Sequence, residues 1–253
     1  MNLRSSSAYY LSQPFWRFLR KILNKKIWTY FYTLYQKFLF SGLAEKLLHS
    51  NLELKENLNY PAYKEVNKSS DEKFSNLLIK SSKPEGKYRD YLDNLFIKLK
   101  HKTFTILEIG VSSGASLRAM EKYFSSAYLW GVDIDKETFF KTERINHLGW
   151  VDQLKLDSMK KFSSNINVKY DLIVDDGWHH PQSQINSLVA FLPFLSERGV
   201  YIVEDIVHNQ YEKNYSLIIK ILEKKNFNCK YLVFKNNDSG ISNTLGYLIV
   251  SRK

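Results

Sequence analysis

From Thr103 onward, short apolar runs that end in acidic or turn residues alternate with amphipathic stretches of helical spacing. The apolar runs cover residues 103–111, 127–135, 152–158, 170–177 and 199–206, and the clearest amphipathic stretches are 116–124 and 182–195. Such alternation is typical of a doubly wound, parallel sheet with helices on both faces. We therefore expect an α/β fold in the second half of the chain.

Two further strand-like runs, 229–234 and 244–251, close the chain, and the turn-rich sequence NNDSG separates them. Runs so close together favour an antiparallel hairpin. The sheet should then have seven strands, most of them parallel. With 44% hydrophobic residues the core can be sizeable, whereas the single Cys229 excludes an internal disulfide and a multi-cysteine zinc site.

The basic charge of the chain is concentrated near its start. The formal net charge is +11, and the first 44 residues contain no acidic residue and seven basic ones. The remaining residues therefore carry only 11 − 7 = +4, which is ordinary for a globular domain. A nucleic-acid partner is consequently not indicated by the net charge alone.

Residues 1–58 are expected to form a basic, aromatic helical arm, with one helix starting near Ser12 and a second from Ile27 to about Gly42. Residues 59–100 should form a linker or lid and a lead-in helix, and residues 101–253 the main domain. We expect neither a secretory signal nor a membrane span in the arm, and therefore a cytoplasmic protein.

Two interpretations of residues 12–44 stay open. Their helices either pack on the main domain or on a second subunit, as a homo-oligomer contact, or they attach peripherally to the inner face of the membrane through a basic, aromatic surface. Packing is the simpler interpretation, since no lipidation signal accompanies the arm.

In a doubly wound sheet, ligands bind at the carboxyl ends of the strands. The first expected strand is followed by EIGVSSGAS, in which Gly110 and Gly114 let the backbone turn sharply and approach a ligand beside Glu108. The second ends at Asp133, whose carboxylate can accept both hydroxyls of a ribose, and the third at Asp157, near an adenine edge. Any of these acids could instead be a helix cap.

Carboxylates also follow the next two strands, in DDGWHHP and VEDI. Aligning LIVDD with YIVED puts Asp175 level with Glu204 and Asp176 level with Asp205. Because side chains alternate between faces, Asp176 and Asp205 can converge while the other two acids point elsewhere. Two close carboxylates repel unless a proton or cation lies between them, so a divalent metal such as magnesium or manganese is expected.

Histidines follow the first of these acidic pairs directly. His179 lies three residues after Asp176, within reach of a hydroxyl at the metal, and His180 is beside it. His208 follows the second acidic strand and could line an acceptor pocket. His180, His208, Asp175 and Glu204 are accessory candidates.

Over residues 91–250 the chain resembles the class I S-adenosylmethionine-dependent methyltransferases, a Rossmann-like fold. Glu108, Gly110 and Gly114 match their E/D-x-G-x-G-x-G motif, and Ser112 stands at its middle glycine. The DDGxHH and ED elements resemble the macrocin O-methyltransferase branch, which methylates sugar hydroxyls with magnesium. The resemblance implies Asp176 and Asp205 as metal ligands and His179 as general base.

The function expected from the residues and this resemblance is metal-dependent methyl transfer from S-adenosylmethionine to a sugar hydroxyl. The acceptor would be a nucleotide-activated sugar or a glycan, for example in surface polysaccharide biosynthesis. An RNA methyltransferase that uses the basic arm is the alternative, although the chain lacks an N/D-P-P-Y/F motif. A noncatalytic cofactor-binding module is the third hypothesis.

Overall fold

The computed structural model describes residues 23–59, 72–78, 87–140, 142–235 and 244–253. The chain divides into two compact units, residues 1–49 and 50–253. The described part of the first unit is one long helix, α2 (Lys25–His49). The helix expected near Ser12 lies largely outside the described residues.

Helix α2 continues through Gly42, where the sequence predicted an end. A single glycine in a helix interior costs only about 1 kcal/mol relative to alanine, so it does not by itself end a helix. None of the described helices combines the length and the apolar character that crossing a membrane requires.

The second unit is built on a seven-stranded sheet in the order β3-β2-β1-β4-β5-β7-β6. The first five strands are parallel, and β7 runs antiparallel to both β5 and β6. The expected mostly parallel sheet and its terminal hairpin are confirmed. The strands are β1 (Thr105–Ile109), β2 (Tyr128–Asp133), β3 (Ile145–Trp150), β4 (Tyr170–Asp175), β5 (Leu195–Val207), β6 (Phe227–Lys235) and β7 (Thr244–Arg252).

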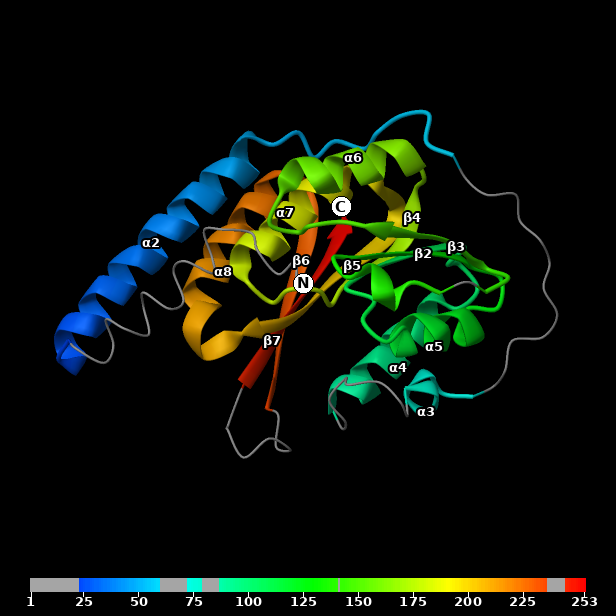
Figure 1. Ribbon diagram of the computed structural model, residues 1–253, viewed down its shortest axis with the longest axis horizontal. Helices are drawn as coiled ribbons and strands as arrows, with labels where there is room; N and C mark the ends of the chain where they lie inside the picture. The colour runs from blue at the N-terminus through cyan, green and yellow to red at the C-terminus, as the bar shows by residue number, and fades with distance from the viewer. Residues whose placement is uncertain (1–22, 60–71, 79–86, 141, 236–243) are drawn as a thin grey trace. The chain divides into compact units, whose positions relative to one another are not determined.

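Helices cover both faces of this sheet (Figure 1). One layer contains α3 (Phe74–Leu77), α4 (Lys87–Leu99) and α5 (Ala115–Tyr123), and the other contains α6 (Leu156–Ile166), α7 (Pro181–Phe191) and α8 (His208–Lys224). Phe74, Phe96 and Leu117 of the first layer pack in one buried cluster with Ile106 and Leu172 of the sheet. The lead-in helix α4 is thus part of the core.

The third strand is not where the sequence predicted it. Residues 152–158 form a turn and the first residues of α6, whereas β3 is Ile145–Trp150. β3 is at the edge of the sheet and has a neighbour on one side only. An edge strand needs no continuous apolar run, and its sequence, INHLGW, contains none.

The register between β4 and β5 also differs by one residue from the expected alignment. Asp175 pairs with Val203 rather than with Glu204, so the acids of β5 lie one position further along than predicted. The pairing of β5 with β7 is irregular between Val203 and Ile206, and Asp205 has a positive φ of 55°. This local irregularity re-aims the acidic pair, as β-bulges commonly do.

Candidate active site

The turn after β1 has left-handed backbone at alternate residues. Gly110, Ser112 and Gly114 have φ values of 88°, 49° and 75°. A Cβ on Gly110 would lie 2.4 Å from the Cα of Gly177, so only glycine lets this turn pack against the turn after β4. Ser112, at the expected middle glycine, adopts the same left-handed conformation. Gly114 then precedes α5, whose first N–H groups are suited to a polar ligand.

Asp133, at the carboxyl end of β2, is held by two backbone donors. The N–H of Ser112 donates to Oδ2 at 2.9 Å, and the N–H of Asp135 donates to Oδ1 at 2.9 Å. These bonds fix the carboxylate beside the glycine turn, where the sequence expected a ribose-binding acid. A carboxylate oxygen can accept more than one hydrogen bond, so this geometry leaves Asp133 able to bind a ligand hydroxyl.

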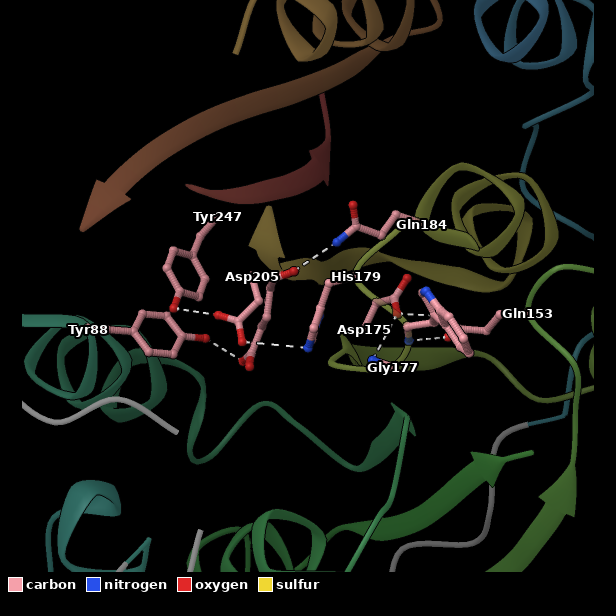
Figure 2. A network of polar contacts seen from close by, with 10 residues as sticks. Tyr88, Gln153, Asp175, Gly177, His179, Gln184, Asp205 and Tyr247 are labelled. Atoms are coloured by element: carbon pink, nitrogen blue, oxygen red, sulfur yellow. Dashed lines mark hydrogen bonds and ion pairs between the residues drawn. The ribbon is translucent and has the colours of Figure 1, made fainter. Parts of the chain in front are cut away.

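The turn after β4 is anchored by Gln153 (Figure 2). Its amide nitrogen donates to Asp175 Oδ1 and to Ser187 Oγ, both at 2.9 Å, and its oxygen accepts from the N–H of Trp178 at 2.6 Å. Burial raises the pKa of Asp175 to about 7, although the bonds from Ser187, Gln153 and Gly177 oppose the rise. Asp175 therefore supports the turn from within the protein.

The acid at the end of β5, Asp205, accepts a hydrogen bond from Tyr247 of β7. The phenol oxygen lies 2.8 Å from Oδ1, while Oδ2 lies 3.7 Å from Nε2 of His179 (Figure 2). Burial, and then the charge of Asp205, raise the pKa of Tyr247. The phenol therefore stays protonated and remains a donor to the carboxylate at neutral pH.

Glu204, beside it, is turned into the protein and is only 2% exposed. Tyr88 of α4 donates a hydrogen bond to its Oε1, and Gln184 of α7 donates to its backbone oxygen at 2.9 Å. The rings of Tyr88 and Tyr247 stack with centroids 3.9 Å apart. Tyr88 thus hydrogen-bonds to Glu204, Tyr247 hydrogen-bonds to Asp205, and the two tyrosine rings stack on each other.

Asp176, His179 and Asp205 converge at this edge of the sheet. Each offers one ligand atom, and these atoms all lie within 4.8 Å of one another. The carboxylates are half-buried and His179 is exposed, so the cluster is accessible from solvent. The two carboxylate oxygens are donors that suit a divalent cation such as magnesium or manganese, and the imidazole nitrogen lies beside them. The residues present fit such an ion.

The remaining candidates have other positions. His180 caps α7, because its Nδ1 accepts from the N–H of Gln182 at 3.3 Å, and burial lowers its pKa to about 4. Asp157 is exposed in the first turn of α6 rather than at a strand end, so its expected position was wrong. Glu108 is fully buried in β1. His208 begins α8, but its side chain lies outside the described part.

Sequence reasoning missed Tyr88, Gln153 and Tyr247. Tyr88 and Tyr247 are separated along the chain from the acids that they contact, Glu204 and Asp205, and reach them only through the packing of α4 and β7 on β5. The role of Gln153 was missed because the sequence pattern predicts a strand over residues 152–158, where the structure has a turn and the start of α6. A regular apolar pattern marks a residue as buried, but it does not show which polar atom a buried tyrosine contacts.

Comparison with known proteins finds similarity to methyltransferases. Residues 107–206 match a family described as a methyltransferase domain. An 8-demethyl-8-alpha-L-rhamnosyl tetracenomycin-C 2'-O-methyltransferase of Streptomyces olivaceus is 29% identical over 118 residues, which are 44% of this chain and 31% of that protein. A demethylmacrocin O-methyltransferase of Streptomyces fradiae is 24% identical over 126 residues, 47% of this chain and 31% of that protein.

Solved structures agree on the fold. The methyltransferase MycE of the mycinamycin biosynthetic pathway, in complex with Mg and SAH, superposes with a TM-score of 0.59 at 19% identity, over 73% of this chain and 55% of that one. An O-methyltransferase of Bacillus cereus, in complex with SAH, gives 0.50 at 13% identity, over 73% and 92%. The expected Rossmann-like methyltransferase fold is confirmed, while the matches span about a third of the curated relatives.

Proposed function

We propose that this chain methylates a sugar hydroxyl with S-adenosylmethionine and a divalent metal, because residues 107–206 match a methyltransferase-domain family and sugar O-methyltransferases are among the similar proteins. The observation that carries the proposal is the convergence of Asp176, His179 and Asp205 next to the glycine turn after β1. The acceptor would be a nucleotide-activated sugar or a glycan.

The glycine turn and Asp133 support a binding place for the cofactor. The left-handed turn would let backbone approach the cofactor closely, and Asp133, fixed by Ser112 and Asp135, would accept hydrogen bonds from the ribose hydroxyls. S-adenosylmethionine would supply a methyl group on a sulfonium, whose carbon–sulfur bond breaks as the carbon–oxygen bond forms. The protein then has to orient the two reactants and handle one proton.

His179 is the proposed base. A sugar hydroxyl is far too weakly acidic to react unaided at neutral pH, so its proton must leave as the oxygen attacks. The Nε2 atom of His179, exposed beside Asp205, would take that proton, and the carboxylate would stabilise the resulting imidazolium. Asp176 and Asp205 would hold the divalent cation, whose charge stabilises developing negative charge on the acceptor.

The test is a transfer assay with labelled S-adenosylmethionine and panels of nucleotide sugars, glycans and RNA, with and without EDTA. We expect methyl transfer to a sugar acceptor. EDTA should abolish this transfer, and added magnesium should restore it. Replacing the base (His179→Ala) should lower kcat by about 10²- to 10⁴-fold, because general-base catalysis contributes that much. Replacing the exposed His101 of the α4–β1 turn (His101→Ala) is the control and should leave kcat unchanged.

Four results would contradict the proposal. Transfer that EDTA does not affect would contradict the proposed metal dependence. Wild-type turnover in Asp176→Asn or His179→Ala would contradict the roles proposed for these residues. Methylation of RNA alone would favour the nucleic-acid alternative. Tight cofactor binding without transfer to any panel would favour a noncatalytic module.

A further inference from the structure

Among the described side chains of α2 from Ile27 to Phe38, five large apolar ones are exposed along one face of the helix. Their exposed fractions run from 44% for Leu34 to 83% for Phe38. They recur at intervals of three and four residues, so they form one continuous row, which we name the aromatic stripe. Its members are Ile27, Tyr30, Phe31, Leu34 and Phe38. Three of the five are aromatic, and burying them would remove much apolar surface from water.

The charge next to the stripe has a single sign. Positions 26 and 37 are lysines, four residues before and seven after Tyr30, so helical geometry puts them along the edge of the stripe on which Tyr30 lies. The first acidic residue of α2 is Glu45, beyond the end of the stripe. A surface that covers the stripe must therefore be apolar where it meets the rings and negatively charged at the rim.

A second copy of α2 does not meet this requirement. Between Lys25 and Ala44 the helix offers no carboxylate, so pairing two stripes would bring lysines together without a counter-charge. An anionic bilayer offers both components, since acyl chains accept the apolar rings and lipid phosphates accept the lysines. Tyrosine and phenylalanine suit this boundary because their rings are apolar, and the tyrosine hydroxyl can remain in water.

We propose that the aromatic stripe of α2 binds the surface of an anionic lipid bilayer, with the helix lying in the plane of the interface. The stripe spans twelve positions, 27 to 38, and is therefore only about 17 Å long at 1.5 Å per residue, which suits lying on a bilayer rather than crossing it. The proposal rests on α2 alone and does not depend on the proposed methyl transfer.

The experiment is co-sedimentation of the full chain with vesicles of phosphatidylcholine, with and without about a third of phosphatidylglycerol. We expect binding to the anionic vesicles that falls steeply between about 0.05 and 0.5 M salt, because salt screens the lysines. Replacing two stripe residues (Phe31→Ser with Phe38→Ser) should weaken the partition coefficient by about 10-fold or more. Circular dichroism of the variant should show that its helix content is retained.

The control removes an exposed apolar side chain of similar exposure from α8 (Leu217→Ser) and should bind as the wild type does. Equal binding to neutral and anionic vesicles, or unchanged binding in the double variant, would overturn the proposal. So would a dimer in sedimentation that the double variant converts to a monomer while vesicle binding is absent, because the stripe would then bind a second copy. Loss of vesicle binding in the double variant, with binding retained in Leu217→Ser, supports the proposed binding of the stripe to a bilayer.

Discussion

Asp205 combines a left-handed backbone, with φ of 55°, and a carboxylate whose two oxygens face different partners. A non-glycine residue in this region stores strain that the surrounding structure must hold in place. Tyr247 supplies part of that restraint through its 2.8 Å hydrogen bond to Oδ1. Its side chain therefore positions a proposed metal ligand.

Removing that hydroxyl (Tyr247→Phe) should weaken binding of Mn²⁺ by about 10-fold, because partners that orient metal ligands commonly contribute 10- to 100-fold to affinity. The ring can still stack on Tyr88, so the fold should be retained. Titration with Mn²⁺ measures the effect directly. Replacing a buried tyrosine at the start of β4 (Tyr170→Phe) is the control, and equal affinities in the two variants would refute a positioning role.

Cys229 in β6 is half-buried, and burial is the main reason that its pKa rises to about 12, with Glu223 adding to the rise. The thiolate is the reactive form, and an ordinary cysteine has a pKa of about 8.5. At pH 8 we therefore expect alkylation of the native protein to be about 10³-fold slower than alkylation in denaturant. A native rate within a few-fold of the denatured rate would contradict this.

The same shift affects stability with a definite sign. Because the pKa of Cys229 is higher in the folded than in the unfolded state, its contribution is present below about pH 8.5 and is lost as pH rises toward 12. Replacing the thiol with an apolar group (Cys229→Ala) should remove this part of the pH dependence. The difference in unfolding free energy between wild type and variant, measured from pH 8 to 10, checks the sign.

Between elements, the turns after β1 and β4 are packed without room for a side chain. Alanine at position 110 would need an unfavourable φ of 88° and would bring Cβ within 2.4 Å of Gly177 Cα. Gly110→Ala should therefore destabilise the protein by about 2–4 kcal/mol, since positive-φ strain alone contributes about 1–2 kcal/mol. A Cβ added to Gly42 in α2 would have no atom of another part of the protein within 4 Å, so Gly42→Ala should be neutral or stabilising by up to about 1 kcal/mol. Denaturant unfolding compares the two, and similar losses in both variants would contradict the packing argument.

The elements that the sequence predicted well are those buried on both faces. The runs 103–111, 170–177 and 199–206 became β1, β4 and β5 of the sheet interior, where continuous apolar sequence is obligatory. The edge strand β3 was mislocated because an edge strand does not require such a run, while Leu154 and Leu156 around Lys155 imitate strand alternation. Local pattern alone does not separate a turn followed by a helix from a short strand.

The site itself was predictable only in part. The convergence of Asp176, His179 and Asp205 followed from the rule that carboxyl ends of parallel strands share one edge, even though the register was off by one residue. The left-handed Asp205 and its bond from Tyr247 were not predictable, because they arise where β5 leaves regular pairing with β7. Irregular backbone of this kind depends on tertiary packing.

At the scale of the whole molecule, ligand binding and folding are linked. A divalent cation that binds only the folded state stabilises it by RT ln(1 + [L]/Kd), which is about 2.7 kcal/mol at a hundredfold excess over Kd. For a protein of this size, each kcal/mol raises Tm by about 2–4 °C, so saturating Mg²⁺ should raise Tm by about 5–10 °C. The clustered acids of the folded protein provide the reason for this preference, since the unfolded chain does not hold Asp176 and Asp205 together.

The shift should disappear when one proposed ligand loses its charge (Asp176→Asn), and that variant should have a metal-free Tm at or above the wild-type value because two close carboxylates no longer repel. An exposed acid in the first turn of α4 provides the matched control, and Asp90→Asn should keep the full shift. Differential scanning calorimetry with and without EDTA separates the two variants. An equal Mg²⁺ shift in Asp176→Asn and Asp90→Asn would mean that the ion binds elsewhere, because a site that lacks one of two carboxylates cannot retain its full differential affinity for the folded state.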